Sequence, residues 1–169
     1  MSKYARFLHN PAFKGSRELS LDVVVDMIRY FANSSMVTNL YRVKLLELLW
    51  YVDALSHKCR GHAISGLVYR ALPMGAVPVA YESIVDLSTI HCEEIDMGDR
   101  TAYRFLPTAD KSYSNLTSED QGILDVIIMK FCKFTKNEIV ETMYREDAYT
   151  RTASHDIIDF KYVQTLSLS

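Results

Sequence analysis

The sequence predicts a mainly helical α+β fold, in which a helical core carries a small antiparallel β-sheet or hairpin. Two long stretches place apolar residues at helical spacing, and two short stretches near the middle of the chain have the pattern of paired strands. The chain has 169 residues, of which 49% are apolar, which suffices for one domain with a core of its own. We expect an N-terminal arm over residues 1–19 and a single domain over residues 20–169.

The first two predicted helices have recognisable ends. Ser20 is a typical N-cap, and the helix that follows it turns one apolar face inward before it ends at residues 33–35. A second helix is expected from about Asn39 to Arg60, and Gly61 stands where a glycine commonly ends a helix. We expect this second helix to bury one leucine-rich face, formed by Leu45, Leu48, Leu49, Val52 and Leu55.

The middle of the chain predicts short elements separated by turns. A short strand is expected within residues 64–72, followed by a rigid loop from Pro73 to Pro78. A short helix is expected over residues 79–87, because a proline suits the start of a helix. Residues 90–96 and 101–106 predict the two strands of a hairpin.

The C-terminal third returns to helical spacing. We expect one helix to begin at Thr117 or Ser118 and another at Thr135. Ser118 with Gln121, and Thr135 with Glu138, have the spacing of capping boxes. The tail over residues 147–169 carries an isolated apolar run. We expect it to pack back on the body through Ile157, Ile158, Phe160, Tyr162 and Val163.

Charge and composition exclude several classes of function. The formal net charge of −2 gives no global field that would hold nucleic acid or an anionic membrane. The apolar runs are too short to cross a bilayer, and the N-terminus lacks the apolar segment of a signal peptide. The three cysteines are odd in number and far apart, which favours reduced thiols. We therefore expect a cytoplasmic protein without a membrane or nucleic-acid partner.

No catalytic or metal-binding constellation stands out. His57 and Cys59 point apart on a helix, and no second ligand pair follows to complete a zinc site. Glu93, Glu94 and Asp96 form a small acidic cluster, for which an exposed edge strand is a commoner explanation than a cation or acid–base site. The motifs of phosphate binding, dinucleotide binding and the usual hydrolases are missing. We expect no enzyme, no metal and no cofactor.

The segment over residues 44–78 admits two interpretations. One is a buried Trp50 followed by a structural turn. The other is an aromatic patch and a rigid loop presented to a protein partner, because Trp, Tyr, Met and Arg are enriched at such surfaces. The residues by themselves do not decide between the two.

This segment resembles the Panacea antitoxin domain family, which is also called SocA-like. The resemblance rests on KLLELLWYVDALSH at residues 44–57, Gly61, ISG at 64–66, YRA at 69–71 and PMGAVP at 73–78, and it extends over about residues 20–165. The chain departs from the usual pattern at Val52, Met74 and Ala76. These departures imply a less rigid loop and a different choice of partner.

The resemblance implies a non-enzymatic antitoxin that neutralises a cognate toxin by direct protein binding. Members are typically encoded beside their toxin in bacteria or prophages. At least one branch acts as a proteolytic adaptor that delivers its toxin to the ClpXP protease, and this is an alternative for the present chain. A phage or host regulatory module that binds another protein is a further alternative.

We expect the partner to contact the helix face opposite the leucines, together with the loop over residues 73–78. The glycine of the loop is expected to supply backbone freedom and the prolines rigidity. For Asp53 we also consider a structural role, in which its carboxylate orients the loop by accepting its backbone N–H groups. The candidate contact residues are Trp50, Tyr51, Asp53, His57, Tyr69, Arg70, Pro73, Met74, Gly75 and Pro78.

Overall fold

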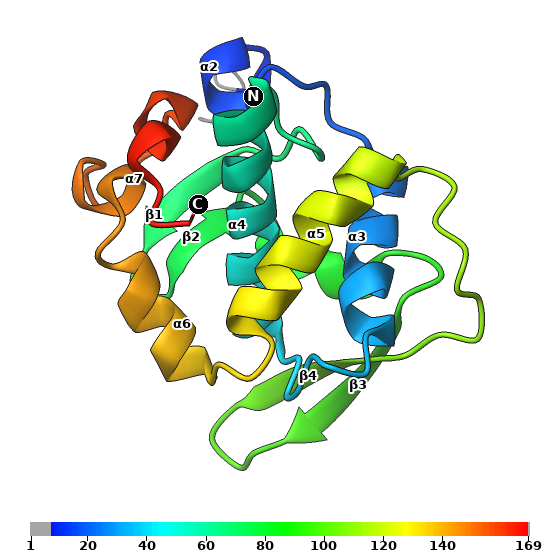
Figure 1. The fold of residues 1–169 in the computed structure, drawn as a ribbon. Coiled ribbons are helices and arrows are strands. Elements are labelled where there is room, and N and C mark those ends of the chain that lie inside the picture. The colour runs from blue at the N-terminus through cyan, green and yellow to red at the C-terminus, as the bar shows by residue number, and fades with distance from the viewer. Residues whose placement is uncertain (1–7, 169) are drawn as a thin grey trace.

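The computed structural model describes residues 8–168 and confirms the mainly helical α+β class (Figure 1). In chain order, the elements are α2 (Pro11–Lys14), α3 (Leu21–Asn33), α4 (Arg42–Arg60), β1 (Tyr69–Leu72), β2 (Gly75–Pro78), the 3₁₀ helix η1 (Tyr81–Asp86), β3 (His91–Asp96), β4 (Thr101–Leu106), α5 (Ser118–Phe131), α6 (Lys136–Met143), α7 (Asp147–Thr150) and the 3₁₀ helix η2 (Phe160–Thr165). Helix α4 lies at the centre, and α3, α5, α6, β2, β4 and η2 pack against it.

The ends of the first two long helices follow the predicted signals. The Ser20 hydroxyl accepts a hydrogen bond from the Val23 N–H at the start of α3. Gly61 ends α4 in the left-handed conformation, with φ at 82°, and its N–H donates to the His57 carbonyl. The start of α4 lies at Arg42, which is a few residues later than expected. Within the expected arm, α2 packs on η2, whereas residues 1–7 lie outside the described part of the chain.

One of the two predicted capping boxes is displaced by a residue. The box that opens α6 is confirmed, and so is Thr117 as one of the two residues expected to open α5. The box predicted at Ser118 and Gln121 is wrong, because Thr117 pairs with Asp120. The buried Asp120 carboxylate also accepts a hydrogen bond from Arg60 at 2.8 Å. Asp120 therefore takes part both in the cap of α5 and in the contact between α5 and α4.

The described strands form two antiparallel hairpins. β3 pairs with β4 as predicted. The rigid loop expected over residues 73–78 is wrong, because Gly75–Pro78 is strand β2, which pairs with β1 from Tyr69 opposite Pro78 to Leu72 opposite Gly75. Only Pro73 and Met74 remain in the turn between the two strands. The short helix expected after Pro78 is the 3₁₀ helix η1.

The C-terminal tail packs back on the body, as predicted. The Ile158 N–H donates to the Tyr69 carbonyl at 2.9 Å, and the Ala71 N–H donates to the Asp156 carbonyl at 3.0 Å. The tail therefore lies along the free edge of β1. Of its predicted contacts, Tyr162 is half-buried, and the others, Ile157, Ile158, Phe160 and Val163, are buried.

The fully buried Asp53 joins α4 to the segment that leads into β1. Its Oδ1 accepts hydrogen bonds from the N–H groups of Ile64 at 2.9 Å and Ser65 at 3.0 Å, and its Oδ2 accepts from the hydroxyls of Ser65 at 2.5 Å and Tyr69 at 2.6 Å. Burial raises the pKa of Asp53, and the four hydrogen bonds oppose that rise. Asp53 thus orients residues 64–69, and the expectation that it orients residues 73–78 is corrected.

Replacing Asp53 by alanine is expected to lower the free energy of unfolding by about 3–5 kcal/mol, because four buried donors lose their acceptor. Urea unfolding followed by circular dichroism measures the change. As a control, Asp99→Ala in the exposed turn between β3 and β4 should stay within about 0.5 kcal/mol of the wild type. A loss below about 1 kcal/mol for Asp53→Ala would contradict the assigned role.

Candidate functional site

The ten predicted contact residues divide into a buried and an accessible group. Pro73 is exposed, and His57, Arg70 and Met74 are half-buried. The other six are buried, namely Trp50, Tyr51, Asp53, Tyr69, Gly75 and Pro78. For these six, the expectation that they lie on an accessible face is corrected.

The reason for this correction is the position of α4 in the fold. The predicted leucine face is buried, but so is the opposite face, because every side chain from Lys44 to Ser56 is buried. The Tyr51 ring lies 4.5 Å from that of Phe131 on α5, and its hydroxyl donates to the buried Glu146 carboxylate at 3.2 Å. Elements that follow much later in the sequence therefore cover the face of α4 that was expected to be accessible.

The accessible part of the predicted site is the turn between β1 and β2. Two tyrosines hold its backbone: Tyr149 donates to the Leu72 carbonyl at 2.7 Å, and Tyr144 donates to the Pro73 carbonyl. The two tyrosine rings lie 5.1 Å apart. The turn is therefore fixed by side chains from the end of α6 and from α7.

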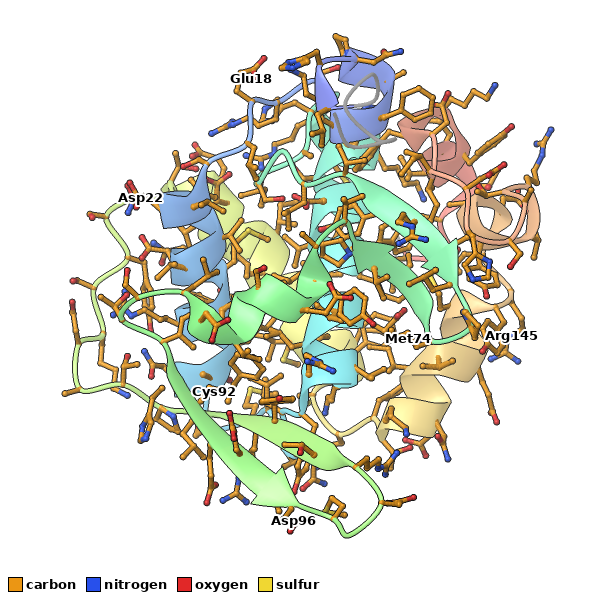
Figure 2. All side chains as sticks on the ribbon, turned by 180° about the vertical axis from the view of Figure 1, so that it is seen from behind. Glu18, Asp22, Met74, Cys92, Asp96 and Arg145 are labelled. Carbon is orange, nitrogen blue, oxygen red and sulfur yellow. The ribbon has the colours of Figure 1, made fainter. Side chains whose placement is uncertain are left out.

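We define the turn surface as Pro73, Met74, Tyr144 and Arg145. Pro73, Tyr144 and Arg145 are exposed, and Met74 is half-buried against the core. Met74 and Arg145 lie at the same edge of the molecule (Figure 2). Tyr144 and Arg145 are not predicted from the sequence, because no local pattern connects them with a turn about 70 residues earlier.

A buried carboxyl group lies beneath this turn. Glu47 of α4 is fully buried, and within residues 8–168 neither of its carboxyl oxygens has a hydrogen-bond partner. A Cβ atom at Gly75 would lie 2.2 Å from Glu47 Oε1, and Gly75 has a φ of 112°, which favours glycine. Glu47 is not among the residues predicted from the sequence, although an acid that stands between two pairs of leucines is a visible signal.

Burial without a partner raises the pKa of Glu47 well above its ordinary value of 4.5. The carboxyl group is therefore protonated in the folded protein under conditions in which the unfolded chain has lost the proton. Between those two pKa values, the folded state binds more protons than the unfolded state, so that stability decreases as the pH rises.

The described residues give little indication of a metal site or of an acid–base site. Across residues 8–168, no three His, Cys, Asp or Glu side chains are grouped so that they could hold a metal ion. In the acidic cluster, Glu93 pairs with Arg104 at 2.7 Å, whereas Glu94 and Asp96 are exposed. Among the described helices, none has the length and apolar character needed to span a membrane.

The described part of the surface also has two grooves. One, of about 510 Å³, lies between α3 and α5 and is lined in part by Tyr30, Met36 and Met129. The other, of about 420 Å³, is formed by residues at the starts of α4 and α6 and in the β3–β4 hairpin. It is lined in part by Arg42 and Tyr103.

Glu47→Gln is expected to change the pH dependence of stability. The wild type should lose up to about 1.4 kcal/mol per pH unit between the unfolded-state and folded-state pKa values of Glu47, and the variant should not. The free energy of unfolding of the variant relative to the wild type should therefore increase as the pH rises above about 4.5. Urea unfolding over a pH series measures this difference. The exposed Glu141→Gln on α6 is the matched control, and a pH-independent difference for Glu47→Gln would contradict the prediction.

Comparison with known proteins gives a match to a protein family. The family model described as antitoxin SocA-like, Panacea domain, matches residues 45–149. No curated protein and no solved structure matches the chain. The matched region includes nearly all of α4, both hairpins, α5, α6 and most of α7, and therefore the whole turn surface. Because the match covers more than half of the chain, this protein belongs to the SocA-like antitoxin family with a Panacea domain.

Proposed function

We propose that this protein is an antitoxin that neutralises a cognate toxin by direct protein–protein binding. Membership of the SocA-like antitoxin family carries the proposal, because the family name indicates an antitoxin-like domain and hence a toxin as the kind of partner. The proposal places this encounter in the cytoplasm of a bacterial host, with the toxin encoded by a neighbouring gene of the host or of a prophage.

The turn surface is the proposed place of contact. Tyrosine, methionine and arginine are enriched at protein interfaces, and Met74, Tyr144 and Arg145 bring these three residue types together. The hydrogen bonds from Tyr144 and Tyr149 hold the turn in place before a partner arrives. A surface that is ordered in advance loses less conformational entropy on binding, which favours affinity.

The remaining accessible candidates have weaker support. His57 lies near the C-terminal end of α4, where its ring packs on that of Phe160 at 5.3 Å. Arg70 is half-buried on β1, where it pairs with Ile157 of the tail. A partner contact by either residue stays a prediction.

The test of the proposed function is co-expression with the small growth-inhibiting protein encoded by the neighbouring gene. Growth is expected to recover when both proteins are present, and the purified proteins are expected to form a complex. Toxin abundance should remain constant under neutralisation by binding, whereas a ClpXP-dependent fall would indicate the proteolytic adaptor. Persistent growth arrest with both proteins folded would contradict the antitoxin proposal.

Met74→Asp is expected to weaken toxin binding at least about tenfold, because a charge replaces an apolar side chain in the proposed contact. Isothermal titration calorimetry measures the affinity, and circular dichroism shows that the variant is folded. The matched control is Met129→Asp on α5, because Met129 is 68% exposed and lies outside the turn surface. If both variants lose affinity equally, or if neither loses affinity, the toxin contact lies elsewhere.

A further inference from the structure

The groove at the start of α4 concentrates positive charge. We call it the α4 groove and define it by Arg42, Arg100, Lys136, Tyr41, Met97 and Tyr103, which come from the start of α4, the β3–β4 hairpin and the start of α6. Its volume is about 420 Å³, and its lining includes three cationic side chains and no acidic one. Within the described part of the chain, no ion pair joins any of these three cations to a carboxylate.

The helix that begins at this groove increases the positive character of the region. Helix α4 has no side-chain cap and no acidic residue in its first turn, where Arg42 and Lys44 stand instead. The buried Lys44 ammonium group donates to the carbonyls of Thr38 at 2.7 Å and Cys132 at 2.8 Å, so that its partners are neutral. The positive end of a helix dipole favours anions and disfavours cations. An anionic partner would offset this unfavourable arrangement.

The cations of the groove differ in how firmly they are held. The Arg42 guanidinium lies over the Tyr103 ring, with 4.6 Å to the centroid, and also faces the Tyr81 ring at 5.5 Å. These rings fix its position without neutralising its charge. Arg100 and Lys136 are exposed, so their charged groups are free to reach a ligand that enters the groove.

We propose that the α4 groove binds a carboxylate-rich segment of a protein partner. The lining favours this class because it combines cations with apolar and aromatic side chains, among them Met97, which is 51% exposed. A segment in which acidic and apolar residues alternate would satisfy both. Nucleic acid fits less well, because its affinity depends on contacts with many phosphates, and the lining of this groove supplies three cations.

The α4 groove and the turn surface lie at the two ends of α6. The helix begins with Lys136 at the groove and ends at Met143, next to Tyr144 of the turn surface. Eight helical residues span about 12 Å, which is well within the reach of a single protein interface. The inference rests on the proposed function in one respect, since it takes the toxin as the partner that supplies the acidic segment.

The test is a nuclear magnetic resonance titration of the full chain, labelled with nitrogen-15, with a synthetic peptide of about ten residues in which Glu and Leu alternate. Amide resonances of Arg42, Val43, residues 101–103 and Lys136 are expected to shift. A peptide with Gln in place of Glu should bind at least about tenfold more weakly, because electrostatic complementarity is lost.

Charge reversal tests the same site from the side of the protein. The double variant Arg100→Glu/Lys136→Glu should bind the acidic peptide at least about tenfold more weakly. It should remain folded, because Arg100 is exposed and glutamate is favourable in the first turn of α6. The control is Lys130→Glu, an exposed lysine on α5 outside the groove, which should stay within about twofold of the wild type.

The outcomes separate this inference from the proposed function. Three results would each overturn the inference, whether or not the antitoxin rescues growth. They are equal affinity of the acidic and the Gln peptide, shifts of amide resonances outside the groove, and unchanged peptide binding by the double variant. If a single-stranded oligonucleotide binds at the groove more tightly than the acidic peptide does, the inference is overturned in favour of a nucleic-acid ligand. Peptide binding at the groove without growth rescue would uphold the groove and contradict the antitoxin proposal.

Discussion

The buried carboxylate of Asp53 is the interaction on which most of the described architecture depends. It accepts four hydrogen bonds from residues 64–69, and this fixes the path of the chain from the end of α4 into β1. Strand β1 then pairs with β2 on one edge and with the C-terminal tail on the other. A buried carboxylate is tolerated because its hydrogen-bonding capacity is filled.

Glu47 lies six residues before Asp53 on the same helix, and its hydrogen-bonding groups are in the opposite situation. Its carboxyl group is buried without a hydrogen-bond partner in the described residues, directly beneath the turn that carries Met74. Gly75 provides the space that this group occupies. Buried polar groups without a hydrogen-bond partner lower the stability of the fold, and natural proteins concentrate such groups at functional sites. The position of Glu47 therefore agrees with the proposed role of the turn surface.

The two proposed binding regions differ in chemistry but share α6 as their support. The turn surface offers a methionine, a tyrosine and an arginine on a backbone held by two tyrosine hydroxyls. The α4 groove offers cations beside aromatic rings. The net charge of −2 conceals this local positive region, because no acidic side chain is among the residues that line the groove. Averages over composition thus exclude general electrostatic binding but say nothing about a local groove.

The sequence by itself determined the long helices, both ends of α3, the C-terminal end of α4, the β3–β4 hairpin and the inward packing of the tail. These features depend on caps, turns and periodicity within a few residues. Only the tertiary structure decided that α4 is buried on all sides, that residues 75–78 form a strand and that Tyr144 reaches Pro73. Burial of the second face of α4 depends on elements that arrive up to about 100 residues later in the chain, and no local pattern encodes such contacts.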